Sequence, residues 1–156
     1  MFNPSIIVKL VLVLLFNFLE ASANDIATTI NDIDLRIDKI KNKYYLIRHD
    51  IFSPGNSVTT NFDIYSDSLK AISSELIASR NEIFKKIFDQ DLEKNHLDKI
   101  SKIKLKSGLL NNSISVLLNI NKYYNTSNDN TLTTFGDYEA QIKRLVTFEK
   151  LFYEIK

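Results

Sequence analysis

Residues 26–51, IATTINDIDLRIDKIKNKYYLIRHDI, decide the fold of this chain. Steps of four and three residues along this stretch meet an apolar side chain at every stop, namely Ile26, Ile30, Ile33, Ile37, Ile40, Tyr44, Ile47 and Ile51. Residues at that spacing share one face of an α-helix. A strand would need apolar residues at every second position, and Asp32, Asp34 and Asp38 break that alternation. We therefore predict a helix over residues 25–52, with an apolar face that we name the isoleucine stripe.

Three further stretches show helical spacing. Residues 61–88 carry a stripe made of Phe62, Tyr65, Leu69, Ile72, Leu76 and Ile83, with Ser79 as its one polar member. The stripe is widened by Ile64, Ile77, Phe84, Ile87 and Phe88, and a stripe that broad is expected to be covered by more than one neighbouring helix. Residues 92–124 and 136–156 are predicted to form the third and fourth helices on similar stripes.

Polar segments separate these helices. Residues 53–60 and 125–134 are expected to be loops, and a tight turn at Asp89-Gln90-Asp91 is expected to join the second and third helices. Because that turn contains no Gly or Pro, one long bent helix stays open as an alternative. Gly108 lies in the middle of the third helix, where glycine costs about 1 kcal/mol relative to alanine. A break there would make five helices instead of four.

These four lengths predict an all-α, up-down-up-down four-helix bundle. Isoleucine at both heptad positions of the first helix favours three or four packed helices over two, and packing within one chain supplies them most simply. In this topology the two long loops lie at the same end of the bundle. The tyrosine pairs at 44–45 and 123–124 are expected near that end.

The first 23 residues are typical of a secretory signal peptide. Lys9 precedes the apolar run 10–19, and Ala21 and Ala23 supply the small residues that precede a cleavage site. The mature chain would then begin at Asn24 and form a single domain over residues 24–156. A retained membrane anchor is the alternative, although a span needs about 20 apolar residues and Lys9 and Asn17 interrupt this run.

Composition limits the chemistry of the chain. Its 156 residues fit one domain and include 20 basic and 19 acidic residues, so no strong overall field would attract nucleic acid, and none is expected as a partner. The chain has no cysteine, which excludes disulfides, thiolate catalysis and zinc–thiolate sites. A secreted chain without cysteine is more typical of a bacterial envelope than of a small eukaryotic secreted domain.

No motif predicts an enzyme or a cofactor. Glu93-x-x-His96 has the spacing of a di-iron helix motif, but that site needs the motif twice and two further glutamates. Asp89-x-Asp91-x-Glu93 resembles the start of a calcium loop and lacks the glycine and the closing glutamate. There is no G-x-S-x-G and no glycine-rich phosphate loop. We therefore expect no catalytic residues, no metal site and no cofactor.

Several residues are instead candidates for partner binding. Lys99, Lys102 and Lys106 share one face of the third helix, where they would either meet an acidic partner or form a solvated surface. Leu35 and Leu46 lie on the side of the first helix opposite the isoleucine stripe, and we expect them to be buried by a second neighbour rather than exposed. The remaining candidates are Tyr45, Tyr123 and Tyr124, because tyrosine suits both interfaces and helix ends.

The sequence thus favours an exported, non-enzymatic helical bundle that binds another macromolecule, most simply a protein of the cell envelope or of a host. It would act in the periplasm, on the cell surface or outside the cell. One alternative is a lipid- or membrane-associated protein with amphipathic helices. Another is a structural oligomer assembled through the isoleucine stripe as a coiled coil. The oligomeric state stays open.

Overall fold

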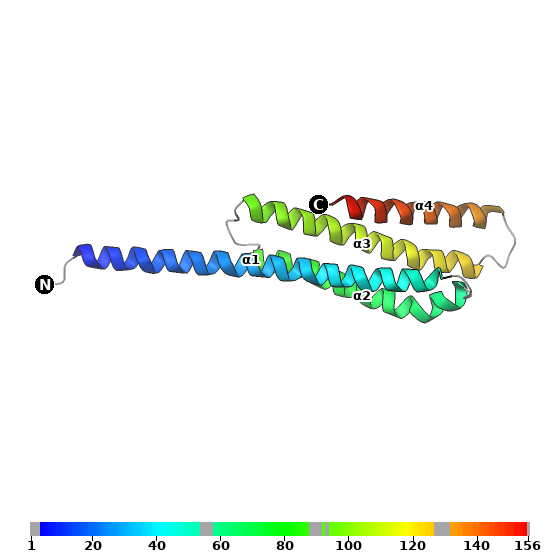
Figure 1. Cartoon of the computed structure of the whole chain (residues 1–156), viewed down its shortest axis with the longest axis horizontal. Coiled ribbons are helices and arrows are strands. Elements are labelled where there is room, and N and C mark those ends of the chain that lie inside the picture. Colours follow the sequence, from blue (N-terminus) through cyan, green and yellow to red (C-terminus); the bar gives the residue numbers. More distant parts are fainter. Residues whose placement is uncertain (1–3, 54–57, 88–91, 93, 127–131, 156) are drawn as a thin grey trace.

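A computed structural model describes the backbone of residues 4–53, 58–87, 92, 94–126 and 132–155, and the side chains of 25–53, 62–85, 92, 94–120 and 137–155. This part of the chain contains no strand and forms four helices: α1 (Pro4–Ile51), α2 (Val58–Ile87), α3 (Lys94–Thr126) and α4 (Leu132–Glu154). Successive helices run in opposite directions, so the predicted all-α up-down architecture is confirmed (Figure 1).

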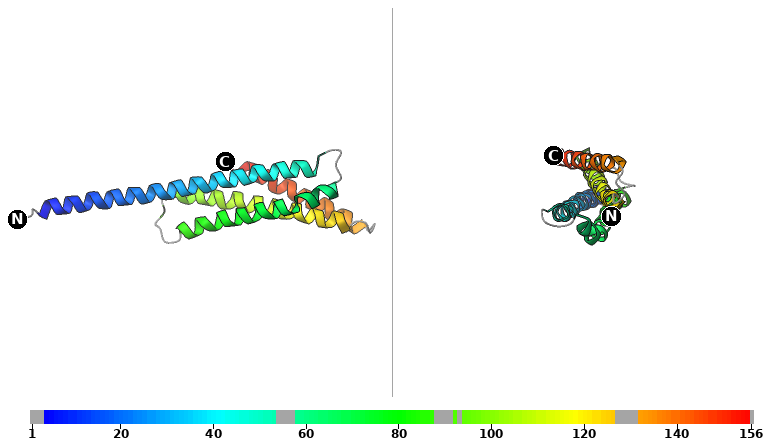
Figure 2. Two further views of the ribbon diagram at one scale, coloured as in Figure 1. Left: turned by 90° about the horizontal axis from the view of Figure 1, so that it is seen from below. Right: turned by 90° about the vertical axis from the view of Figure 1, so that its right-hand side faces the viewer.

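The four helices are not equivalent in their packing. α1, α2 and α3 all pack on one another, whereas α4 packs along α3. Over the described residues, the backbone of α4 approaches neither α1 nor α2 closely. The end-on view in Figure 2 accordingly shows α4 stacked on one side of the molecule. The backbone of α4 therefore joins the bundle through α3, while Leu145 and Phe152 of α4 belong to the same core as the side chains of the other helices.

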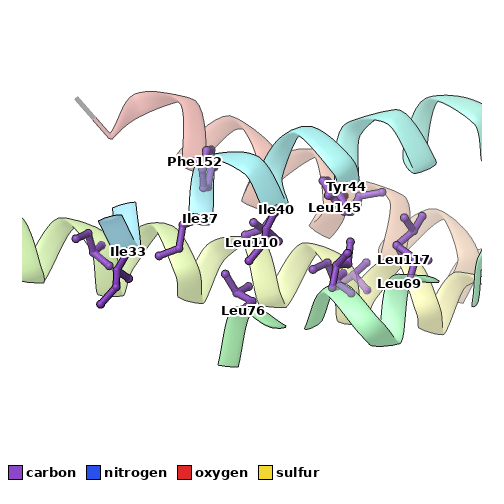
Figure 3. Close-up of a cluster of buried hydrophobic side chains, with 14 of the residues drawn as sticks. Ile33, Ile37, Ile40, Tyr44, Leu69, Leu76, Leu110, Leu117, Leu145 and Phe152 are labelled. Carbon is purple, nitrogen blue, oxygen red and sulfur yellow. The ribbon is translucent and has the colours of Figure 1, made fainter. Parts of the chain in front are cut away.

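The isoleucine stripe lies at the centre of this core. Ile33, Ile37 and Ile40 are completely buried, and Tyr44 and Ile51 continue the buried line. Figure 3 shows the stripe from Ile33 to Tyr44 among side chains of the other helices, which include Leu69, Leu76, Leu110, Leu117, Leu145 and Phe152. Full burial of each such side chain contributes about 1.5–3 kcal/mol. The stripe therefore builds the core of its own chain.

Both open alternatives about the third helix are settled. α3 runs from Lys94 to Thr126 without a break, so Gly108 does not divide it and the described part contains four helices. The cost of one glycine, about 1 kcal/mol, is small beside the burial of Leu110 and Ile114 in the following turns. α2 and α3 lie side by side and antiparallel, so the single bent helix is wrong (Figure 1). The predicted turn at 89–91 lies outside the described residues.

Several helix ends differ from the prediction, and α2, for example, begins at Val58, inside the loop predicted over residues 53–60. α3 continues to Thr126 and α4 begins at Leu132, so the loop predicted over 125–134 was too long. Asn and Thr are only slightly worse helix formers than most residues, and extending an existing helix is easier than starting one. α1 begins at Pro4 instead of residue 25, because no Pro or Gly interrupts residues 5–53. Whether Ala21, Ala23 and Asn24 form a cleavage site stays a prediction.

Candidate interaction surface

The described residues contain no group of three or more His, Asp or Glu side chains placed to hold a metal ion. Glu93, half of the di-iron-like pair, lies outside them. Its partner His96 is buried at the start of α3, and its backbone N–H donates a hydrogen bond of 2.7 Å to Oδ1 of Asn95. His96 thus has a structural environment at the beginning of a helix.

The structure corrects the expectation that Leu35 and Leu46 are buried. Their side chains are 55% and 69% exposed. In the described part of the chain, α1 packs on its neighbours mainly through the isoleucine stripe, which leaves both leucines in solvent on the opposite side. Because the two leucines are eleven residues apart, about 16 Å along the helix, they are isolated and form no continuous patch. Single exposed leucines are ordinary on protein surfaces.

Tyr45 is half-buried and contributes to the contact between α1 and α4. Its ring stacks on that of Tyr153, with centroids 5.6 Å apart and planes inclined by 30°. It also meets the ring of Tyr44 edge-on, at 5.2 Å. Burial and then the Tyr153 phenol raise the pKa of Tyr45 above its ordinary value. Tyr45 therefore has a packing role, and the side chains of Tyr123 and Tyr124 lie outside the described residues.

The lysine face of α3 is divided. Nζ of Lys106 lies 2.9 Å from Oδ1 of Asp34 on α1, in a half-buried ion pair. Lys99 and Lys102 are exposed and form no ion pair within the described residues. The three side chains thus share a face, as predicted, but one of them holds α3 to α1 and two remain in solvent.

A buried polar cluster joins α1 to α4. The hydroxyl of Tyr44 donates a hydrogen bond of 2.7 Å to Oε1 of Glu149, which is buried. Nε of Arg48 lies 2.5 Å from the same oxygen, yet it makes no aligned hydrogen bond in the described part of the chain. The contact is therefore an ion pair. Because α1 and α4 are not in close backbone contact, these long side chains bridge them.

The same cluster keeps Tyr44 protonated. Burial, followed by the charge and hydrogen bond of Glu149, holds the pKa of Tyr44 far above its ordinary value, while Arg48 opposes this shift. A phenol in that environment donates a hydrogen bond and does not exchange its proton near neutral pH. The Tyr44–Glu149–Arg48 cluster therefore acts as a structural bridge between α1 and α4.

A surface that the sequence did not reveal lies where α2 meets α3. Two contacts across these helices define it: Oγ of Ser73 donates a hydrogen bond of 2.9 Å to Oδ1 of Asn111, and Nζ of Lys104 lies 4.4 Å from the ring centre of Phe84. Ile77 lies one turn after Ser73 on α2, and Gly108 lies between Lys104 and Asn111 on α3. Helical periodicity thus places both between the two contacts.

We name this surface the α2–α3 patch and define it by Ile77, Phe84, Leu97, Lys104 and Gly108. Leu97 belongs to it because it lies two helical turns before Lys104, on the same side of α3. Ile77, Phe84 and Leu97 are 48%, 42% and 49% exposed. No heavy atom lies within 4 Å of where a Cβ on Gly108 would stand, apart from the helix itself. The patch is therefore apolar, half-exposed and open at its centre.

Positive charge surrounds the patch. Arg80 lies between Ile77 and Phe84 on α2, and Lys94 lies one turn before Leu97 on α3. Both are exposed, and neither forms an ion pair with any residue that the structure describes. Two acidic residues of α2 are engaged with α1: Glu75 pairs with Lys43, and Glu82 pairs with Arg36. Arg80 thus has no acidic residue at helical spacing on α2, whereas Asp98 lies one turn after Lys94 on α3.

The prediction that Ile64, Ile77 and Phe84 are covered by additional neighbours was wrong, since all three are exposed. α2 has only two helical neighbours in the described structure, and both contact its main stripe. One signal was available in the sequence. Ile77 and Phe84 each follow a stripe residue, Leu76 or Ile83, by one position, which turns them about 100° away from the core.

Within the fully described part of the chain, none of the helices has a stretch long and apolar enough to cross a bilayer. Comparison of the chain with known protein families, with characterised proteins and with solved structures finds no match.

Proposed function

We propose that this protein is an exported, non-enzymatic helical bundle that binds another macromolecule on its outer surface. The observation that carries the proposal is the α2–α3 patch. The core is formed by the isoleucine stripe and its partners, and Ile77, Phe84 and Leu97 lie outside it and are about half-exposed. Exposed apolar residues that gather at one place with unpaired cations are typical of an interaction site.

The N-terminal segment supports this proposal independently of the patch. The signal-like segment 1–23 directs the protein to the envelope or beyond, where a partner of the envelope or of a host is available. The chain itself offers no cysteine for redox chemistry or covalent attachment. A rigid scaffold that presents a surface is the function that these features favour.

A pull-down tests the proposal. The exported protein is immobilised and incubated with envelope and host extracts, beside a variant in which Ile77→Ser and Phe84→Ser remove the apolar part of the patch. We expect a partner that the wild type retains and the double variant loses. The control is Ile64→Ser, which removes a more exposed apolar residue on the other side of α2. No partner from either extract would contradict the proposal.

Membrane association is the second candidate function. The observation in its favour is an exposed aromatic ring beside cations, as in Phe84 with Lys104, a combination that suits the surface of an anionic bilayer. Flotation with neutral and with anionic liposomes tests it. Failure to float with either would remove this candidate.

A structural oligomer would have to use the exterior of the bundle. The isoleucine stripe is buried within its own chain and is not free to pair with other chains. Sedimentation at high protein concentration tests for such assembly, and a monomer would argue against it.

A further inference from the structure

We infer that the α2–α3 patch docks an acidic amphipathic helix of a partner protein. This inference rests on the proposed function and names the class of partner that this surface fits. Shape, charge and the degree of exposure of the patch residues lead to it in turn.

Shape comes first. α2 and α3 lie antiparallel, and the Ser73–Asn111 and Lys104–Phe84 contacts hold them together at two points of the patch. A third helix placed along the line where two helices meet is the ordinary way in which helical bundles add a member. Gly108 lies at the middle of this line and leaves the space above it open. A partner helix can therefore approach closely at that point.

Charge gives the sign of the partner. Arg80, Lys94 and Lys104 lie around the apolar residues and have no acidic partner within the described residues, whereas Glu75 and Glu82 of α2 are engaged with α1. Asp98, the acidic residue of α3, is rotated about 100° away from Leu97 and lies one turn after Lys94, so Arg80 and Lys104 are the cations that have no acidic residue at helical spacing. Carboxylates on a docking helix would form ion pairs with these cations. Because the whole chain carries a net charge of only +1, this attraction is local to the patch.

The degree of exposure favours a helix over a bilayer. Ile77 and Phe84 are about half-buried where α2 meets α3, so they line the contact between the two helices and do not project from it. The side chains that protrude most, such as Leu46 and Ile64, are scattered over other faces. Insertion into a bilayer needs apolar side chains that project together from one face. A partner helix instead inserts its own side chains between α2 and α3.

A pair of peptides tests the inference. The probe is a fluorescent, hydrocarbon-stapled helix with leucine on one face and glutamate on the other, and its twin has lysine in place of every glutamate. Fluorescence anisotropy follows the binding of each to the exported protein. We expect the acidic peptide to bind and its basic twin to fail.

Three variants locate the binding. Lys104→Glu, in the patch, is expected to weaken binding of the acidic peptide by about tenfold or more. Lys99→Glu makes the same charge change on the side of α3 that faces α1, and is expected to leave the affinity within about twofold. Gly108→Gln puts a longer side chain into the open space and improves helix propensity, so it is expected to reduce binding while the protein becomes no less stable. This last variant separates docking from folding.

Several results would overturn the inference. Equal weakening by Lys99→Glu and Lys104→Glu would show general charge attraction. Binding of vesicles that contain phosphatidylglycerol, abolished by Lys104→Glu while the acidic peptide does not bind, would assign the patch to a membrane. Dimerisation lost in Lys104→Glu would assign it to a second copy. If extracts yield a partner that the acidic peptide does not displace, the inference fails and the proposed function stands.

Discussion

The isoleucine stripe of α1 and the α2–α3 patch contain similar residues in opposite surroundings. Ile33 and Ile40 are seven residues apart and completely buried, whereas Ile77 and Phe84 are also seven residues apart and about half-exposed. Both pairs follow helical spacing. Spacing therefore predicts that residues share a helix face, but it does not predict whether another helix covers that face.

The number of neighbours explains the difference. The stripe faces α2 and α3, and the long side chains of Tyr44 and Arg48 reach α4 as well. In the described structure α2 packs only against α1 and α3, and both of these helices contact its main stripe. Ile77 and Phe84, which follow residues of that stripe by one position, therefore remain about half-exposed to solvent. Removing residues from each region should thus have different consequences.

The largest effect is expected from a pair of matched truncations. Ile37→Ala removes buried methyl groups and leaves a cavity, so the free energy of unfolding should fall by about 2–5 kcal/mol. Ile77→Ala removes the same groups from the patch and should cost less than about 1 kcal/mol. Urea unfolding followed by circular dichroism measures both. Equal losses would mean that the patch is part of the core.

A smaller effect is expected at the bridge between α1 and α4. Glu149→Leu leaves the Tyr44 hydroxyl without its acceptor and the Arg48 guanidinium without its carboxylate, and should cost about 2–3 kcal/mol. Adding Arg48→Leu removes the unpaired charge, so the double variant should regain part of this stability. Thermal unfolding gives the comparison. Additive losses in the double variant would show that the two side chains act independently.

Alkaline pH tests the same bridge. The folded state raises the pKa of Tyr44 above the unfolded value of about 10, so its contribution is fully present below pH 10 and is lost as pH rises above it. The loss should be about 1.4 kcal/mol per pH unit for this tyrosine. Urea unfolding between pH 9 and 11 should therefore show a steeper decline for the wild type than for Tyr44→Phe. Parallel declines would mean that Tyr44 ionises as easily folded as unfolded.

The smallest effect should be a gain. Gly108→Ala should raise the free energy of unfolding by about 1 kcal/mol, because alanine is the better helix former and its Cβ meets open space. Ser107→Ala is a useful comparison, since Ser107 is buried one residue away and its hydroxyl bonds to the Lys104 carbonyl. Thermal melts of both variants suffice. Destabilisation by Gly108→Ala would mean that the space is occupied.

Much of the fold could be predicted from periodicity alone. The isoleucine stripe identified both a helix and the centre of the core, because apolar residues in an unbroken helical register have one efficient way to leave water. The continuity of α3 could not be decided in this way. It depends on whether the free energy gained by burying apolar side chains on either side of Gly108 exceeds the cost of a glycine within a helix. The packed structure shows that it does.

The interaction surface was less predictable. Leu35 and Leu46 were expected to be buried and are exposed, because the sequence does not say on which side of α1 a neighbour is missing. Helical periodicity places Lys99, Lys102 and Lys106 on one face of α3 and gives no signal for Lys104. Its position over the Phe84 ring follows from the register between α2 and α3, and that register is a tertiary property.

The central claim is that the α2–α3 patch is a contact surface and that other exposed apolar residues are not. Site-specific photo-crosslinking tests it most directly, with p-benzoylphenylalanine placed at either Phe84 or Ile64 of the exported protein. Both sites are exposed apolar positions on α2, but only the first lies in the patch. In extracts that contain the partner, we expect a crosslinked product from position 84 and little or none from position 64. A product from position 64 with none from position 84 would contradict it.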